Sequence, residues 1–346
     1  MRSGHEVKKD IKSMSFGELE KDFNAIGFKK YRALQIFRWL NSGVSQFDEM
    51  TDIPIETRRK LDFEYEIVNL DIVKKTVSSD GSIKYLLRLC DAECIETVVM
   101  SYNYGLVVCI STQLGCRMNC RFCANFGSGF VRNLTAAEMI SQIQVVSKDL
   151  CKRINNVTLM GIGEPFDNYE NVMVFLKLIT FEKGMNIGAR HVTVSTCGLA
   201  DKIEMFAREK MAVSLSVSLH ASNNFTRSKI MPVNNRYGIT ELLNSCKYYI
   251  SKTNHRITFE YIMIEDFNDS INDALNLGKL IKNILCHVNL IPANFVEGSG
   301  FSPSSKENIN KFFNILVGMK LSVTIRRSLG VDINASCGQL RKLNLC

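Results

Sequence analysis

The chain has 346 residues, of which 46% are hydrophobic and 23% are charged, and its formal net charge is +8. This length and composition indicate a globular protein with one large domain and a smaller one, and they exclude a low-complexity or repeat protein. The positive charge fits an anionic partner such as nucleic acid, although a basic enzyme without such a partner has the same balance.

No apolar run approaches the roughly 20 residues that a membrane-spanning helix requires, and the polar start MRSGHEVKKDIKSMS lacks the apolar core of a signal peptide. We therefore expect a cytoplasmic protein that does not enter a membrane. The twelve cysteines are scattered through a long chain. We expect most of them to be reduced thiols and not a disulfide framework.

Residues 14 to 62 show apolar positions at helical spacing, which predicts a small N-terminal helical domain over residues 1–64. Ser15 and Glu18 form a capping-box pattern at the first helix, and Gly43 fits the end of the second. Several basic residues can meet an RNA backbone, and they equally fit a solvated helix face. They are Lys29, Lys30, Arg32 and Arg38.

Residues 65–101 change to the pattern of short strands and predict a β extension that leads into the next domain. Asp80 and Gly81 stand together between two alternating runs and predict a hairpin turn. A further predicted strand, ECIETVVM, contains Glu96. An isolated glutamate in a strand usually points to solvent, so the strand pattern by itself assigns Glu96 no function.

Residues 102–346 alternate strands with helices, which predicts an α/β, barrel-like fold of parallel βα units. The predicted strands are GLVVCIST, which contains Cys109, and INNVTLMG, RHVTVSTCG, MAVSLSVSLH, HRITFEYIMI, CHVNLIPAN and LSVTIRRS. The predicted helices span residues 134–150, with Asn133 as the cap, and residues 169–181, 201–209, 240–251, 272–283 and 304–319. A buried cysteine is commonly a small hydrophobic residue, which is the ordinary interpretation of Cys109.

Cys116, Cys120 and Cys123 stand at CxxxCxxC spacing in a loop after the first of these strands. Three thiols at this spacing can hold an iron–sulfur cluster, and because such clusters usually take four cysteine ligands, one iron remains to bind another molecule. A structural zinc site needs a second pair of Cys or His ligands, and the flanking sequence offers none. Three unrelated thiols remain the alternative.

Polar residues recur where later strands end. They are Gly163, Glu164 and Pro165, then Ser195, then Ser218, Leu219 and His220, and finally Asn294. Each group is weak evidence alone, since a serine at a strand end often caps a helix and a histidine can belong to the core. Together with the three cysteines they predict one polar site at the carboxyl ends of the parallel strands, the mouth of the barrel.

These motifs resemble those of the radical S-adenosylmethionine (SAM) enzymes and, within that superfamily, those of the RlmN/Cfr family of RNA adenine methyltransferases. The similarity extends over nearly the whole chain, and the matching segments occur in the family's order. They are CISTQLGCRMNCRFC, MGIGEPFDN, ARHVTVST, SVSLHA, HVNLIPAN and TIRRSLGVDINASCGQL. The resemblance implies a partial (βα)6 barrel, over residues 102–346, that methylates C2 of adenine.

The resemblance also implies a role for each matching residue. Cys116, Cys120 and Cys123 would ligate one 4Fe-4S cluster, whose fourth iron holds SAM. The residues implied to bind SAM are Gly163, Glu164, Ser195, Ser218, Leu219, His220 and Asn294, with Glu164 at the amino group. The implied catalytic residues are Cys337, which becomes S-methylated, Cys109, its disulfide partner, and Glu96, the proton acceptor.

Adenine C2 is an electron-poor aromatic carbon, so polar transfer from a sulfonium cannot reach it and a radical route is required. In the implied mechanism Cys337 takes a methyl group from a first SAM. A second SAM then supplies a radical that removes hydrogen from this methyl group, and the resulting carbon radical adds to C2. Glu96 takes the C2 proton, and Cys109 attacks the sulfur of Cys337, so that a disulfide frees the product.

The implied partners are 23S rRNA at the peptidyl transferase centre, an anticodon-adjacent adenosine of transfer RNA, and an electron donor such as flavodoxin or ferredoxin. We expect a monomer. The basic N-terminal domain is the natural candidate for holding RNA while an adenine leaves its stack. Further charge near the mouth comes from Arg117, Arg121, Arg132, Arg326 and Arg327.

Other functions stay open. A C8 methyltransferase of the Cfr type, which gives antibiotic resistance, shares the cluster and the catalytic residues, but there alanine follows the glutamate where this chain has Pro165, and this favours C2. An iron–sulfur electron-transfer protein would not need Cys337 or Glu96. An RNA-binding module would leave the polar mouth unexplained. Cys346 is an alternative to Cys337 as the methyl carrier.

Overall fold

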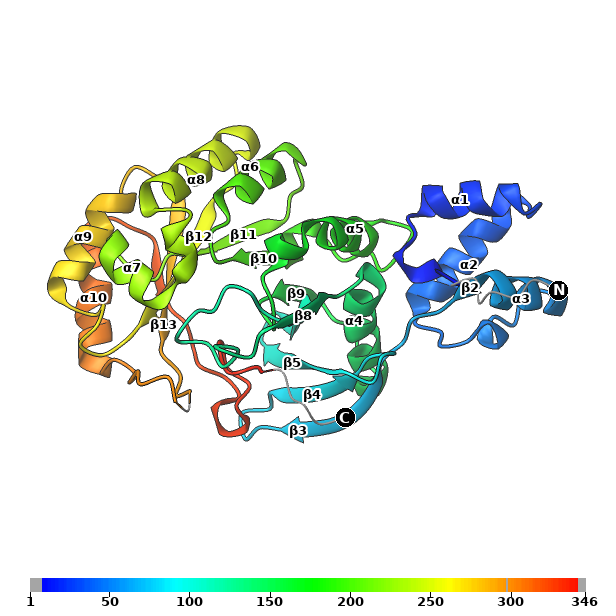
Figure 1. Cartoon of the computed structure of the whole chain (residues 1–346), viewed down its shortest axis with the longest axis horizontal. Helices are drawn as coiled ribbons and strands as arrows, with labels where there is room; N and C mark the ends of the chain where they lie inside the picture. The colour runs from blue at the N-terminus through cyan, green and yellow to red at the C-terminus, as the bar shows by residue number, and fades with distance from the viewer. Residues whose placement is uncertain (1–7, 297, 342–346) are drawn as a thin grey trace.

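A ten-stranded sheet organises the chain in the computed structural model, which describes residues 8–296 and 298–341 (Figure 1). The strands follow one another across the sheet in the order β14 (Val323–Ile325), β13 (Cys286–Pro292), β12 (Ile257–Met263), β11 (Ser214–Ser218), β10 (Val192–Thr196), β9 (Asn156–Leu159), β6 (Gly105–Cys109), β5 (Cys94–Tyr102), β4 (Ile83–Arg88) and β3 (Asp71–Val77). Neighbours from β14 to β6 are parallel, whereas β6, β5, β4 and β3 are antiparallel.

Helices join the successive parallel strands and lie along the outer side of the curved sheet (Figure 1). They are α4 (Ala136–Leu150), α5 (Tyr169–Thr180), α6 (Ala200–Arg208), α7 (Asn224–Ile230), α8 (Ile239–Thr253), α9 (Ile271–Ile281) and α10 (Lys306–Gly318). The edge strands β14 and β3 do not pair with each other in the described part of the chain. This arrangement confirms the predicted α/β fold with an open, partial barrel.

Alternation along the strands separates the core from the interior of the barrel, because successive side chains point to opposite faces. In β10, Val192 and Val194 are fully buried in the main hydrophobic core, whereas Ser195 lines a cavity. The same strand therefore supplies apolar side chains for packing and a polar side chain for a site.

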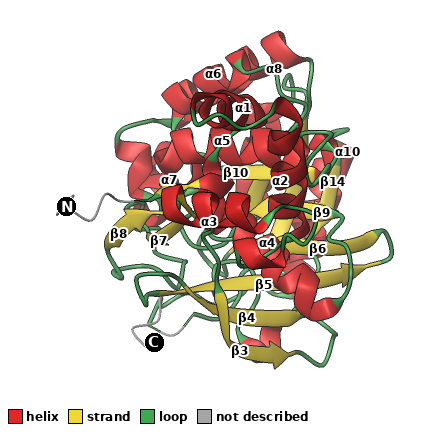
Figure 2. Cartoon of the chain, turned by 90° about the vertical axis from the view of Figure 1, so that its right-hand side faces the viewer, coloured by secondary structure: helices red, strands yellow, loops and turns green. Residues whose placement is uncertain are grey.

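The antiparallel strands β3, β4 and β5 lie side by side at one edge of the sheet (Figure 2). The turn between β3 and β4 confirms the hairpin predicted at Asp80 and Gly81, and Gly81 has the positive φ of 85° that such a turn favours. β5 then pairs with β6, so this β extension is continuous with the barrel sheet.

The N-terminal helices α1 (Phe16–Ala25), α2 (Lys30–Ser42) and α3 (Ile55–Glu64) form a separate group at one end of the molecule (Figure 1). The capping box at Ser15 and the end of α2 at Gly43 are confirmed. Two short strands, β1 (Lys9–Asp10) and β2 (Tyr65–Glu66), pair in parallel and close this unit.

A buried lysine fixes the N-terminal unit to the barrel. The Lys12 ammonium donates to the carbonyl of Val68 at 2.8 Å, to Asn69 Oδ1 at 3.1 Å and to Ser141 Oγ of α4 at 2.9 Å. Burial lowers the pKa of Lys12 to about 8. Its three hydrogen bonds compensate for the loss of hydration.

Three local features differ from the sequence prediction. Asn133 is not the cap of α4, because its side-chain oxygen accepts a hydrogen bond from Gln113; Thr135 is the N-cap and forms a capping box with Glu138. Helix α7 and the hairpin of β7 (Gln113–Gly115) and β8 (Phe130–Asn133) were not predicted.

No helix in the described ranges is long and apolar enough to cross a membrane.

Candidate active site

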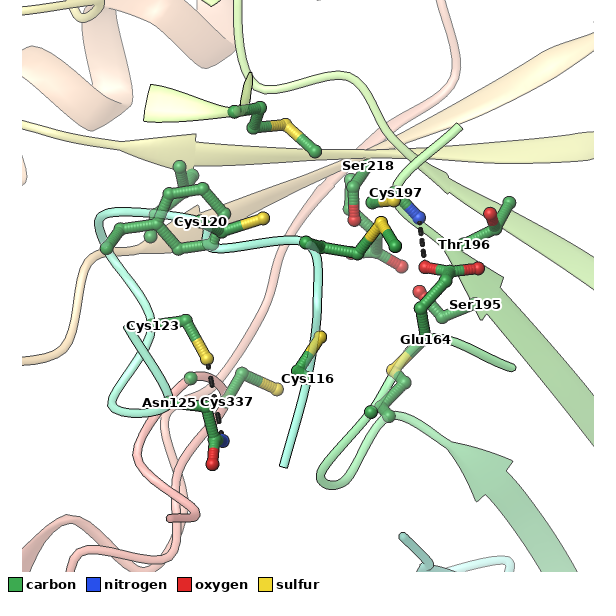
Figure 3. A pocket seen from close by; sticks show the side chains of 18 of the residues that line it. Cys116, Cys120, Cys123, Asn125, Glu164, Ser195, Thr196, Cys197, Ser218 and Cys337 are labelled. Carbon is green, nitrogen blue, oxygen red and sulfur yellow. Dashed lines mark hydrogen bonds between the residues drawn. The ribbon is translucent and has the colours of Figure 1, made fainter. Parts of the chain in front are cut away.

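The three cysteines of the CxxxCxxC motif lie on one tight loop that follows β7 (Figure 3). The loop begins at Gly115, whose φ is 76° and where a Cβ atom would stand 2.0 Å from the carbonyl oxygen of Gly129, so no other residue fits there. The Cys116 N–H donates to that same carbonyl at 3.1 Å, and the Cys123 N–H donates to the Cys120 carbonyl at 3.1 Å. These backbone bonds fix the loop without using the thiols.

The donor set fits an iron–sulfur cluster. All three thiols line one cavity, yet in the described ranges no three His, Cys, Asp or Glu side chains converge on a single ion. Thiols that surround a space larger than one ion suit a cluster of several atoms. Burial raises the pKa of Cys116 to about 12 and raises the pKa of Cys120 and Cys123 as well. As thiolates they need a positive partner, which iron supplies.

Glu164 stands on the opposite wall of this cavity, which we call the barrel cavity (Figure 3). Gly163 before it has a φ of 103°, and a Cβ atom there would lie 2.6 Å from Cβ of Gln113. The buried carboxylate accepts hydrogen bonds from the backbone N–H of Cys197 at 2.7 Å and of Phe166 at 3.1 Å. Burial raises the pKa of Glu164, and the bond from Cys197 opposes this effect. Lone pairs remain free to accept an amino group.

A fully buried arginine, Arg227, holds the ends of two strands beside this carboxylate. Its guanidinium donates to the carbonyls of Cys197 at 2.7 Å, Ser218 at 2.9 Å and Leu219 at 3.0 Å, and to Asn234 Oδ1 at 3.1 Å. Hydrogen bonds to a charged group contribute about 1.5–3 kcal/mol each. Arg227 therefore fixes the backbone of the predicted SAM-binding segment after β11. It was not predicted from the sequence, because three of its four partners are backbone carbonyls.

His220 is a neutral residue of the cavity wall. Its Nδ1 accepts the backbone N–H of Ile262 at 3.1 Å, so its proton is on Nε2, and its ring meets Phe122 edge to face at 4.9 Å. Burial, helped by the neighbouring Arg227, lowers the pKa of His220 to about 3. The neutral ring therefore lines the cavity in a fixed orientation, with Nε2–H as its one hydrogen-bond donor. The backbone of His220 has a φ of 58°, a conformation that is uncommon for residues other than glycine.

A second carboxylate, Glu260 of β12, lines the barrel cavity, and sequence reasoning missed it. Its Oε1 accepts from Ser216 Oγ at 2.6 Å and from Asn289 Nδ2 at 3.3 Å, while its buried Oε2 has no hydrogen-bond partner. The nearest cation is Arg326, whose Nη1 lies 4.0 Å from Oε2.

Cys337 lies where the C-terminal segment meets the cluster loop (Figure 3). The Ala124 N–H donates to the Gly338 carbonyl at 2.7 Å, and Asn294 Nδ2 donates to the Cys337 carbonyl at 3.1 Å. Cys337 lines both the barrel cavity and a second cavity that also contains Asn294 and Cys109. We call this second space the thiol cavity. Both Cys109 and Cys337 are free thiols.

A guanidinium lies beside these two thiols. Attraction to Cys337 in its ionised form is the largest influence that raises the pKa of Arg326, burial opposes it, and Cys109 acts in the same direction as Cys337. Arg326 also lines both cavities. Burial has the largest effect on Cys109 and raises the pKa of its thiol to about 11.

The hairpin turn of the β extension holds the segment that carries Cys337. Asp80 Oδ2 accepts the Gly330 N–H at 2.7 Å, and Asp332 accepts both the Ser78 hydroxyl at 2.5 Å and the Ser79 N–H at 2.9 Å. These bonds join positions that are about 250 residues apart in the chain. The β extension thus positions the C-terminal loop.

Glu96 is buried on β5 and forms an ion pair with Lys84 of β4, with 3.0 Å between Nζ and Oε1. Its Oε2 accepts the backbone N–H of Arg341 at 2.9 Å. Glu96 lines a third cavity and is not in the space that contains Cys337. Val98, two residues after Glu96 on β5, is the cross-strand partner of Cys109. Glu96 and Val98 are roughly 7 Å apart along the same face of the strand.

The structure thus brings most of the predicted residues to one region. The barrel cavity is lined by Cys116, Cys120, Cys123, Gly163, Glu164, Ser195, Ser218, His220 and Cys337, and the thiol cavity by Cys109, Asn294 and Cys337. The Leu219 side chain is buried in the main core, and this residue lines neither cavity. Cys346, the alternative methyl carrier, lies outside the described residues.

Comparisons with known proteins agree with this geometry. Residues 110–278 match the model of the Radical SAM superfamily, and residues 9–67 match the Ribosomal RNA large subunit methyltransferase N-terminal domain. A protein of Alkaliphilus oremlandii (strain OhILAs), named "Probable dual-specificity RNA methyltransferase RlmN", is 49% identical over 98% of this chain and 99% of its own length. A protein of Clostridium novyi (strain NT) with the same name is 46% identical over 96% of this chain and 98% of its own length.

One solved structure has the same fold over almost the whole chain. The crystal structure of a radical SAM methyltransferase from Sphaerobacter thermophilus superimposes with a TM-score of 0.92 at 42% sequence identity. The match covers 96% of this chain and 99% of the other.

Proposed function

The chain belongs to the RlmN family of radical SAM RNA methyltransferases, and from this membership we propose that it methylates C2 of adenine in 23S rRNA and in transfer RNA through an S-methylated Cys337. The coarser activity, SAM-dependent methylation of RNA with a 4Fe-4S cluster, follows from the family itself. The position on the base, the two RNAs and the residue roles are the parts that we propose.

Cys116, Cys120 and Cys123 would hold the cluster, and the wall formed by Glu164, Ser195 and the segment after β11 would hold SAM. A bound cluster supplies the electron that splits SAM into methionine and a radical able to abstract hydrogen. Glu164 offers a buried carboxylate to an amino group, while Arg227 keeps the strand ends in place. His220 contributes a neutral donor to the same wall.

The observation that carries the proposal is the position of Cys337. Its segment is hydrogen-bonded to the cluster loop, and its side chain lines both the barrel cavity and the thiol cavity. One thiol can therefore receive a methyl group on the barrel side and meet Cys109 on the other side. In the proposed step the Cys337 sulfur displaces the methyl group from the sulfonium of SAM, and Arg326 lines both cavities with it.

Glu96 is proposed to take the C2 proton. It is a buried carboxylate two residues along β5 from Val98, the cross-strand partner of Cys109. The proposal requires the adenine to lie between the thiol cavity and the third cavity, which Glu96 lines. In the described structure one of its oxygens accepts the Arg341 N–H, and the remaining lone pairs of the carboxylate are available to accept the proton.

The remaining parts of the proposal concern partners. The N-terminal unit, residues 1–64, is proposed to hold the RNA backbone, the β extension, residues 65–101, to position the Cys337 loop, and residues 102–346 to form the catalytic barrel. We propose a monomer that takes electrons from a flavodoxin or ferredoxin and uses two SAM molecules per turnover. Its proposed substrates are cytoplasmic RNAs, so we place the enzyme in the cytoplasm.

The test is anaerobic turnover of the reconstituted protein with SAM, a low-potential reductant and a 23S rRNA fragment that contains the peptidyl transferase centre. Nucleoside mass spectrometry should find 2-methyladenosine, and a tRNA substrate should give the same product. 8-Methyladenosine would instead identify a Cfr-type enzyme. 5′-Deoxyadenosine without any methylated nucleoside would overturn the RNA methyltransferase assignment for this chain.

A further inference from the structure

Two tyrosines stack on each other at the turn between β5 and β6. The ring centroids of Tyr102 and Tyr104 are 5.0 Å apart, and their planes are inclined by only 10°. Tyr102 pairs with Gly105 across the turn, and Gly105 has a φ of 120° and lies against Asn155. The turn is therefore short and fixed, and it holds the two rings nearly parallel to each other.

The two rings have different environments. Tyr102 is partly buried and lines the thiol cavity, together with Cys109 and Cys337. Tyr104 is 67% exposed, so its outer face is open. An aromatic surface thus continues from the wall of the thiol cavity to the outside of the protein.

Positive charge borders this aromatic surface. Arg326 and Arg327 line the thiol cavity with Tyr102, and both guanidinium groups are close enough to attract the Tyr102 hydroxyl in its ionised form. Arg327 is exposed. An exposed ring, stacked on a second ring that two guanidinium groups border, is a combination that suits single-stranded RNA, since bases stack on aromatic rings and phosphates pair with arginine.

An adenine that reaches the thiol cavity must leave its stack in the RNA, and the bases next to it then lose a stacking partner. We propose that Tyr104, supported by Tyr102, takes up a nucleobase adjacent to the target adenine, and that Arg327 faces the neighbouring phosphate. The inference rests on the proposed function and adds the contact by which flanking RNA is held. Stacking is tolerant of base identity, which suits an enzyme that accepts two different RNAs.

The first test measures RNA affinity of the full chain without cofactors, so that it does not depend on turnover. The probe is the 23S rRNA fragment at low salt, and the variants are Tyr104→Ala, Tyr104→Phe and, as a matched control, Phe225→Ala, which removes a ring that is 73% exposed and lines neither cavity. We expect Tyr104→Ala to weaken binding about tenfold, whereas Tyr104→Phe and Phe225→Ala bind like the parent chain. Equal affinity of Tyr104→Ala and the parent chain would overturn the proposal.

Kinetics separate this contact from a structural role. In reconstituted enzyme we expect Tyr104→Ala to raise KM for RNA about tenfold with kcat within about twofold, because the ring does not touch the reacting atoms. Methylation of Cys337 in the absence of RNA, read by intact-protein mass spectrometry, should be unchanged. A fall in kcat and in RNA-independent methylation would mean that the ring only supports the fold, and this outcome would also overturn the proposal.

The RNA side supplies an independent test. Abasic nucleotides are placed in turn on the 5′ and the 3′ side of the target adenosine, and their effects are measured with the parent chain and with Tyr104→Ala. On one flank, the abasic substitution should weaken binding to Tyr104→Ala much less than it weakens binding to the parent chain, since the variant already lacks the ring on which that base stacks. Full additivity at both flanks contradicts the stacking contact. If the parent chain binds RNA as expected but yields no 2-methyladenosine, only the proposed function fails.

Discussion

The backbone N–H of Ala124 donates a 2.7 Å hydrogen bond to the carbonyl oxygen of Gly338. This bond joins the residue after the last cysteine of the CxxxCxxC motif to the residue after Cys337. It brings two segments that are more than 200 positions apart into one site. The first two predictions concern Cys337 and Cys109, the two thiols that line the thiol cavity.

Cys337→Ala should abolish both methylation of the protein and formation of 2-methyladenosine, because no other thiol lines both cavities in the described ranges. Iron content and the visible absorption of the cluster should stay at the level of the parent protein. The measurement combines metal analysis with mass spectrometry of protein and RNA. Cys151→Ala, which removes an exposed thiol, is the matched control and should retain full activity.

Cys109→Ala should stop turnover after the carbon bond has formed, because in the proposed mechanism the Cys109 thiol frees the product from Cys337. We expect a covalent protein–RNA species that accumulates to about one per active chain and is seen on a denaturing gel. The double variant Cys109→Ala with Cys337→Ala should show no such species. Multiple turnover by Cys109→Ala would remove Cys109 from the mechanism.

Lys84→Met should lower kcat for RNA methylation about tenfold or more, because it leaves the buried Glu96 carboxylate without its cation, 3.0 Å away. Lys84 also donates to the Asn334 carbonyl at 3.2 Å, which links Glu96 to the Cys337 segment. Lys84→Arg keeps the charge and should recover part of the rate. If Lys84→Met formed 2-methyladenosine at the parent rate, Glu96 would not need this positioning residue.

Asp332→Ala should loosen the loop that carries Cys337, because it removes two hydrogen bonds to the β3–β4 turn. We expect slower methylation of Cys337 with an unchanged cluster content and an unchanged melting temperature to within about 2–4 °C. The rate of protein methylation without RNA is the direct measurement. Glu182→Ala, an exposed carboxylate outside this loop, serves as the control.

Acidification should destabilise the fold through His220. Its pKa is about 3 in the folded chain and about 6.5 when unfolded, so below pH 6.5 the unfolded chain binds a proton that the folded chain does not. This group then costs roughly 1.4 kcal/mol of unfolding free energy for each pH unit between 6.5 and 3. Urea unfolding at pH 7 and pH 5 should show a larger loss for the parent protein than for His220→Gln. Equal losses would place the His220 pKa near its usual value.

The spacing of apolar and polar residues was sufficient to predict the order of the βα units, because the periodicity of a strand or a helix is a local property of the chain. The loop cysteines were equally visible in the sequence, since the three proposed ligands of one cluster lie within eight consecutive positions. Asn133 was assigned wrongly as a cap because Asn and Thr have similar preferences there, and the choice depended on Gln113, a partner 20 positions away.

Arg227, Glu260 and Lys84 were not identified as site residues from the sequence. Each acts through partners on other strands or loops: Arg227 through backbone carbonyls of two segments, Glu260 through β11 and β13, and Lys84 through β5 and the C-terminal loop. Such partners have no characteristic spacing, because packing of the sheet brings them together.

The sequence by itself determined the fold class, the cluster motif and the family, because periodicity, ligand spacing and ordered segments are written along the chain. Only the tertiary structure decided that Cys337 borders two cavities, that Glu96 lies in a third, and that Tyr104 extends the wall of the thiol cavity outward. The physical reason is that these relations depend on how distant segments pack. A linear pattern records the period of each segment but not the distance between two of them.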